Sequence, residues 1–214
     1  MRSIACVVPG LLVCASAHAA ELVVQVTDSR GRPAADVVVT VTREPREAPA
    51  PATAPARRTI DQRDETFVPY VEVFAPGDEV VFENSDTTQH HVYSFSPTKT
   101  FELVLRPGER SDPIVLDRPG IVAVGCNIHD RMITYLYVAD AERGQRASPL
   151  GVTTVGDLPA GRWTVAVWHP QLKPGTPPPT QTVELASDAE VRRVTFAIPL
   201  LPDPRRAAPD RGVY

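Results

Sequence analysis

The sequence has few cysteines, few aromatic residues and no long hydrophobic run after its first twenty residues. A membrane-spanning helix needs about 20 consecutive apolar residues, and no later stretch supplies them. No segment of useful length repeats its apolar residues at the helical period. The sequence therefore predicts neither a membrane span nor a helical domain.

Charge is nearly balanced, with 22 Lys and Arg residues against 26 Asp and Glu residues and a formal net charge of -4. Removing Arg2 with the first twenty residues leaves 21 basic against 26 acidic residues, so the net charge becomes -5. This mild acidic excess argues against a nucleic-acid partner. It identifies no protein partner and no oligomeric state.

The first twenty residues have the layout of a secretory signal. Arg2 precedes an apolar run, Ile4 to Val13, which is followed by the small residues Ala17-His18-Ala19-Ala20. We interpret residues 1–20 as a signal peptide that is cleaved near Ala19 or Ala20, which predicts export to the periplasm. A lipid anchor on Cys14 is the alternative, but Val13 suits it poorly.

Only one of the three cysteines, Cys126, lies outside this signal. Cysteines of exported proteins usually pair in disulfides, because their compartment is oxidising. A lone thiol there indicates a partner chain or a metal. The alternative is an inert cysteine that fills an apolar gap in the core.

The rest of the chain consists of short β-branched runs that are separated by proline and glycine turns. Residues 22–27 and 37–42 are expected to form an antiparallel pair of strands. Further strands are expected at 67–74, 79–83, 91–95, 101–105, 114–116, 121–125, 134–138, 163–168, 183–185 and 191–198. Many short strands with this punctuation predict an all-β sandwich or barrel.

One short loop concentrates metal-binding side chains: Cys126, His129 and Met132 lie within seven residues, between two expected strands. The pair His90-His91 stands upstream in a strand. One thiolate, two imidazoles and a weak axial thioether form the ligand set of blue copper sites. Zinc also binds Cys and His, but its structural sites usually have more than one cysteine.

This segment resembles the cupredoxins, with the Cys-x-x-His-x-x-Met spacing of amicyanin and a His-His-Val-Tyr-Ser-Phe-Ser stretch like that of methylamine-utilisation proteins. The resemblance covers residues 60–138 and includes Phe67-Val68-Pro69, the stretch from Gly77 to Asn84 and Pro119-Gly120. It implies a Greek-key β-sandwich and one type 1 copper per chain. The ligands that it implies are His90, Cys126, His129 and Met132.

Two of these assignments have alternatives, and one further histidine needs an interpretation. Adjacent residues of a strand point to opposite faces, so His90 and His91 cannot both reach one copper. We select His90, because the family motif places the ligand first. Met132 is either the axial ligand or only packed near the site. His169, which has no cysteine or acidic residue at ligand spacing, is interpreted as structural.

The flanking strands resemble a second kind of domain. Asp28-x-x-Gly31-x-Pro33 and the downstream stretch Leu158-Pro159-Ala160-Gly161-x-Trp163 look like the two halves of a carboxypeptidase-regulatory or transthyretin-like sandwich. The hypothesis is a discontinuous β-sandwich, residues 21–43 plus 148–200, that contains an inserted cupredoxin domain, residues 61–140. Residues 44–60 are then a Pro/Ala-rich linker, and residues 201–214 a flexible tail. In the alternative, residues 22–42 extend the cupredoxin sheet.

These features together predict a periplasmic electron carrier that cycles Cu(II) and Cu(I) with a redox protein partner. We expect no enzymatic activity, because no second metal cluster and no catalytic triad or carboxylate pair is visible. Copper binding and delivery without electron transport is the main alternative. A structural β-module with a vestigial site is the third.

Overall fold

A computed structural model of the chain describes residues 20–46, 54–186 and 191–206. The expected signal peptide, with Cys6 and Cys14, lies outside these residues apart from Ala20, and so do parts of the expected linker and tail. The described residues form sixteen strands and one 3-10 turn, Pro204–Arg206. The prediction of an all-β protein is confirmed. Within these residues, no helix has the length and apolarity to cross a membrane.

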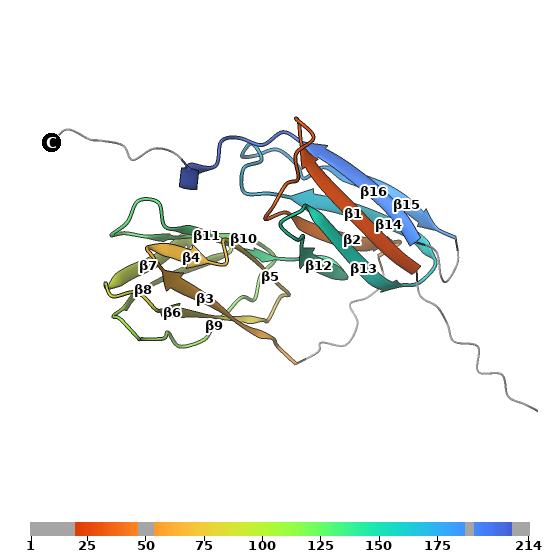
Figure 1. Cartoon of the computed structure of the whole chain (residues 1–214). Helices are drawn as coiled ribbons and strands as arrows, with labels where there is room; N and C mark the ends of the chain where they lie inside the picture. The colour runs from red at the N-terminus through yellow and green to blue at the C-terminus, as the bar shows by residue number, and fades with distance from the viewer. Residues whose placement is uncertain (1–19, 47–53, 187–190, 207–214) are drawn as a thin grey trace, which may run out of the picture.

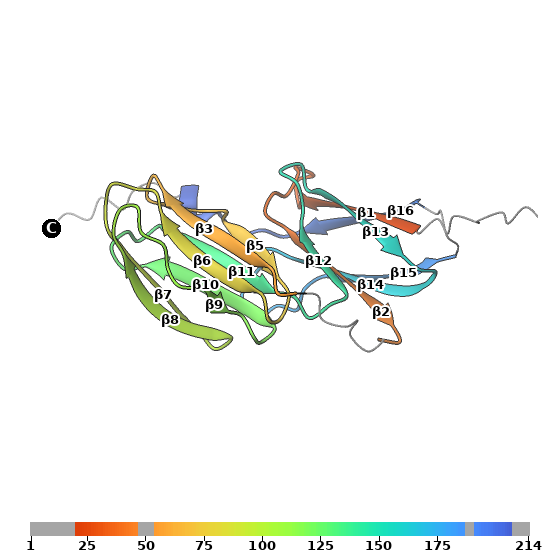
Figure 2. The ribbon, with the colours of Figure 1, turned by 90° about the horizontal axis from the view of Figure 1, so that it is seen from below.

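The strands build two β-sandwiches that lie side by side (Figure 1 and Figure 2). We call the first the terminal sandwich, because its strands come from both ends of the described chain. It consists of β1 (Ala20–Asp28), β2 (Val38–Glu44), β12 (Arg143–Arg146), β13 (Val152–Leu158), β14 (Gly161–Trp168), β15 (Thr180–Leu185) and β16 (Val191–Ile198).

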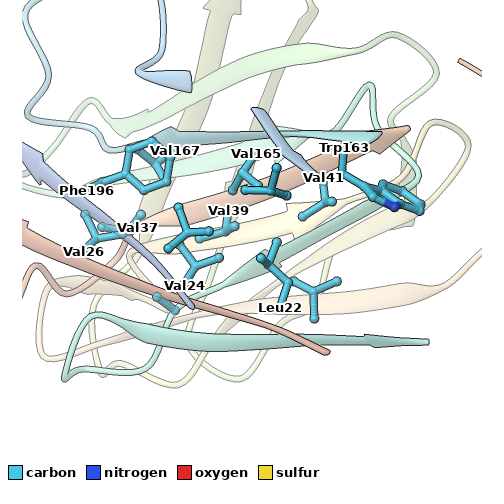
Figure 3. Close-up of a cluster of buried hydrophobic side chains, with 14 of the residues drawn as sticks. Leu22, Val24, Val26, Val37, Val39, Val41, Trp163, Val165, Val167 and Phe196 are labelled. Carbon is cyan, nitrogen blue, oxygen red and sulfur yellow. The ribbon is translucent and has the colours of Figure 1, made fainter. Parts of the chain in front are cut away.

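Two sheets, with strand orders β13-β1-β16 and β12-β2-β14-β15, make up the terminal sandwich. Every second residue of its strands points inward, as the period of two in a strand requires. Figure 3 shows the resulting core, in which Val24 and Val26 of β1 lie across from the sheet where the valines of β2 stand beside those of β14. Trp163 closes one end of the core and is 3% exposed.

The expected antiparallel pairing of residues 22–27 with residues 37–42 is wrong, because β1 and β2 lie in opposite sheets. β1 pairs with β13 and β16, and β2 pairs with β12 and β14. The turn after β1 carries the chain across the core, so both strands bury an apolar face against each other. The β2 residues Val39 and Val41 pair with Val167 and Val165, a contact that favours the insertion hypothesis.

The second unit, here called the central sandwich, is formed by the chain between β2 and β12. It consists of β3 (Arg57–Arg63), β4 (Thr66–Val68), β5 (Val71–Phe74), β6 (Glu79–Asn84), β7 (His90–Ser96), β8 (Lys99–Leu105), β9 (Ile114–Val115), β10 (Gly120–Cys126) and β11 (Ile133–Val138). Its sheets have the orders β5-β11-β10-β7-β8 and β4-β3-β6-β9.

The core of the central sandwich contains Phe67, Phe82 and Val124, and it extends to Cys126 and Met132 at one end. The expected single strand over residues 67–74 is divided into β4 and β5, which belong to different sheets. Pro69 lies at the division, where it has no N–H to donate to a ladder. The chain thus passes from one sheet of the central sandwich to the other at Pro69.

The junctions between the sandwiches contain more strand than the sequence indicates. β3 begins at Arg57, inside the expected linker, and β12 occupies residues 143–146, in a polar stretch where we expect no strand. The residues Arg143-Gly144-Gln145-Arg146 show no apolar alternation, because β12 is an edge strand held by backbone pairing with β2. The domain boundaries themselves stay a prediction.

An aromatic cluster joins the two sandwiches. Trp168 of β14 contacts the rings of Tyr135 and Tyr137 on β11, at centroid distances of 5.8 Å and 5.2 Å. The start of the expected flexible tail also packs here, since the Arg205 guanidinium lies 3.4 Å from the ring centroid of Tyr70. The described part of the tail is therefore in contact with the central sandwich.

Candidate metal centre

His90 is the first residue of β7 and points into the central sandwich, where its side chain is fully buried. The neighbouring His91 points to the outer face, and its Nε2 lies 2.6 Å from Glu102 Oε1. The alternation of side chains along β7 separates the two histidines, as expected. Of the two, only His90 faces the thiol of Cys126.

Cys126 ends β10 and is buried beside β7, where it pairs with Val92. The ladder continues for one more bond, in which the N–H of Asn127 donates to the carbonyl of His91. The loop then closes on itself. The N–H of Met132 donates to the His129 carbonyl at 3.0 Å, and the N–H of Cys126 donates to the Met132 carbonyl at 3.2 Å.

These elements bring His90, Cys126 and His129 together. The Cys126 sulfur lies 3.7 Å from Nδ1 of His90 and 3.9 Å from Nδ1 of His129. All three ligand atoms lie within 4.8 Å of one another. Metal–sulfur and metal–nitrogen bonds of about 2.3 Å and about 2.0 Å, at a trigonal angle, separate sulfur and nitrogen by about 3.7 Å. The observed distances fit one metal ion between the three residues.

A carboxylate faces the far nitrogen of each imidazole. Nε2 of His90 lies 2.8 Å from Asp86 Oδ2, and Nε2 of His129 lies 3.4 Å from Glu65 Oε1. The hydrogen bond to Asp86 assigns the hydrogen of His90 to Nε2 and leaves the lone pair of its Nδ1 for a metal. Carboxylates in this second layer orient metal-binding imidazoles and raise their basicity.

Asp86 remains ionised despite its position. Partial burial alone would raise its pKa, but hydrogen bonds from His90 and from the backbone N–H groups of Glu65 and Asp64 outweigh burial and lower the pKa below its ordinary value. A carboxylate that accepts several hydrogen bonds is a fixed anion. His90 is thus held in one orientation and one tautomer.

Met132 is 2% exposed and belongs to the same buried cluster as Cys126. The closed loop places its backbone against both Cys126 and His129. A role of its sulfur as the axial ligand stays a prediction.

His169 lies in the terminal sandwich, away from this site. Its Nε2–H donates to the Ala35 carbonyl, and its Nδ1 accepts from the N–H of Gln171. Burial lowers the pKa of His169, which keeps it neutral. Both ring nitrogens have protein partners, in agreement with the structural role expected from the sequence.

Asp86 and Glu65 are the site residues that sequence reasoning missed. Asp86 precedes His90 by four residues in an irregular loop, and Glu65 lies 64 positions before His129 in the printed sequence. Asp86 lies outside any strand, so its spacing of four residues from His90 gave no signal in a sequence with no helical period, and Glu65 is too distant in sequence from His129 to be linked to it by any local spacing. The loop between β6 and β7 places Asp86 at His90, and the β3–β4 turn places Glu65 at His129.

No family model and no curated protein matches the chain. Among solved structures, a copper-containing nitrite reductase from Thermus scotoductus SA-01 is similar at 25% identity and a TM-score of 0.35, over 44% of this chain and 24% of that chain. A purple cupredoxin from Nitrosopumilus maritimus has 20% identity and a TM-score of 0.33, over 39% of this chain and 99% of its own. A reduced mutant form of amicyanin has 17% identity and a TM-score of 0.36, over 47% and 98% of the two chains.

This chain thus spans about a quarter of the nitrite reductase that it matches. The candidate metal site rests on geometry: one buried thiol faces two imidazole nitrogens, and a carboxylate lies near the far nitrogen of each ring. Within the described residues, this is the one group of His, Cys, Asp or Glu side chains that suits a metal ion. The central sandwich therefore has a candidate site for one metal ion, at the residues that the sequence resemblance to the cupredoxins predicts as copper ligands.

Proposed function

We propose that this chain is an exported, periplasmic electron carrier with one type 1 copper, bound by His90, Cys126 and His129 with Met132 as the axial ligand. The observation that carries the proposal is the meeting of the Cys126 sulfur with two Nδ1 atoms, at 3.7 Å and 3.9 Å, inside a β-sandwich. Thiolate and imidazole together suit both oxidation states of copper. The bound copper would supply one-electron chemistry.

The protein's own residues would keep the site rigid. His90 and Cys126 belong to adjacent strands of one sheet, so their separation is set by the ladder between β7 and β10. The Asp86 carboxylate fixes the imidazole of His90. Ligands that do not move favour fast electron transfer, because little reorganisation accompanies a change of oxidation state.

His129 is the proposed route by which electrons enter and leave. Its side chain is 21% exposed, whereas that of His90 is fully buried. The neighbouring Ile128 is 51% exposed and adds an apolar contact surface. A redox protein partner would dock at this loop, and we propose no catalytic role for the chain itself.

The test is the visible spectrum of the copper-loaded protein. We expect an intense thiolate-to-copper band that is absent in Cys126→Ser and in His90→Asn. The matched control is His91→Asn, which changes the same residue type one position away on the outer face and retains the band. A wild-type protein without the band, or a Cys126→Ser variant that keeps it, contradicts the proposal.

Copper release separates an electron carrier from a copper-delivery protein. A carrier retains its metal in both oxidation states, and its reduced form loses Cu(I) slowly to a chelator such as bathocuproine disulfonate. Rapid loss of Cu(I) alone would assign the chain to copper delivery. The same titration reports the stoichiometry, which we expect to be one copper per chain.

A further inference from the structure

The turn between β3 and β4 has an unusual backbone for its sequence. Asp64 and Glu65 are its two central residues, between the paired residues Arg63 and Thr66. Both central residues have φ of 51°, the left-handed region that a two-residue type I′ hairpin requires. Glycine, asparagine and aspartate are the usual residues here, whereas the longer side chain of Glu65 is strained in that region.

One carboxylate holds this strained turn in place. The backbone N–H groups of Asp64 and Glu65 both donate to Asp86, at 2.5 Å and 3.0 Å. The same carboxylate faces Nε2 of His90. Asp86 therefore fixes the turn and the buried copper ligand at the same time.

The turn carries the Glu65 side chain to the other imidazole. Glu65 Oε1 lies 3.4 Å from Nε2 of His129, and the Glu65 side chain is itself 60% exposed. A glycine at position 65 would suit the backbone better but would have no carboxylate. Strain that persists at one residue beside a site points to a role for its side chain.

We infer that Glu65 is a positioning residue for His129, and that the Asp64–Glu65 turn, locked by Asp86, holds it there. This inference rests on the proposed copper site. It assigns two effects to the carboxylate. Glu65 restrains the imidazole of the exposed ligand, which slows copper loss, and its negative charge near the metal favours Cu(II) over Cu(I).

The experiment compares Glu65→Gly with Asp64→Gly in the full chain. Both substitutions relieve one left-handed residue of the same turn, but only the first removes the carboxylate at His129. We expect the unfolding midpoint of the metal-free protein to rise by about 1–3 °C in both variants. We expect Cu(I) release to bathocuproine disulfonate to accelerate on the order of tenfold in Glu65→Gly only.

Measuring the reduction potential separates the effect of the Glu65 charge from the effect of its restraint on His129. Glu65→Gln keeps an oxygen acceptor near His129 but loses the charge. We expect it to raise the potential by an amount that corresponds to at most a tenfold change in the Cu(II) to Cu(I) preference, about 59 mV, with copper release near the wild-type rate. Glu65→Gly should raise the potential and also accelerate release.

If Glu65→Gly releases Cu(I) at the wild-type rate and has the wild-type reduction potential, the inference is overturned. The proposed function still stands in that case, provided that the wild-type protein shows the thiolate-to-copper band. Equal acceleration of release in Asp64→Gly would also overturn it, because the turn backbone rather than the carboxylate would then matter. A wild-type protein without the band removes the proposed function itself. A lower midpoint of metal-free Glu65→Gly would contradict the argument from strain.

Discussion

Replacing Trp168 with alanine tests whether the aromatic cluster couples the two sandwiches. Trp168 ends β14 in the terminal sandwich, and its ring contacts Tyr135 and Tyr137 of β11 in the central sandwich. Alanine removes both ring contacts and leaves the strand pairing with Val38 of β2. The substitution therefore acts mainly on the junction between the sandwiches.

The expected loss follows from these contacts. Each aromatic pair contributes about 0.5–1.5 kcal/mol, so two pairs give about 1–3 kcal/mol, and lost burial of the indole brings the total to about 2–4 kcal/mol. In a domain of this size, that shifts the unfolding midpoint by roughly 4–16 °C. Calorimetry should also resolve two transitions where the wild-type protein shows one, since the sandwiches lose part of their coupling.

Trp163→Ala is the matched control, because Trp163 lies in the core of the terminal sandwich and is 3% exposed. It should destabilise that sandwich by about 3–5 kcal/mol without altering the copper spectrum. Trp168→Ala should leave the spectrum unchanged as well. A single transition at the wild-type midpoint in Trp168→Ala would refute the role of the cluster in coupling the sandwiches.

Three further predictions concern stability. Gly151→Ala should cost about 3 kcal/mol or more in urea unfolding, because a Cβ there would lie 2.3 Å from the Val26 carbonyl oxygen, at φ of +70°; Gly31→Ala, at φ of +75° with open space around it, should cost only about 1–2 kcal/mol. Burial lowers the pKa of His169 from 6.5, so its contribution to stability is complete above that value and is lost as the pH falls through the lower folded pKa. The unfolding free energy should therefore fall less between about pH 7.5 and about pH 5 in His169→Asn than in the wild type, and equal pH slopes would contradict this. The copper-free protein should be about 4 kcal/mol less stable to unfolding than the same protein in the presence of free copper at about 1,000 times its Kd. Cys126→Ser should show no such difference between the two conditions.

The sequence alone determined the fold class and the candidate ligands. Short β-branched runs between proline and glycine turns have a period of two, so most strands could be located from local pattern. The loop ligands Cys126, His129 and Met132 are close in sequence, and the alternation of a strand limits the upstream ligand to one of two histidines. These spacings depend only on the local geometry of one loop and one strand, so they can be used before the strand pairing is known.

The tertiary structure decided which strands pair and what supports the ligands. β1 and β2 lie in opposite sheets because both must bury an apolar face in one core, which no local pattern encodes. The edge strand β12 is held by backbone pairing with β2 and by polar contacts of Gln145, so its sequence lacks the apolar alternation that predicts a strand. Glu65 reaches His129 only through the β3–β4 turn, which Asp86 of the β6–β7 loop holds by hydrogen bonds, because contacts between distant segments depend on how the whole chain packs.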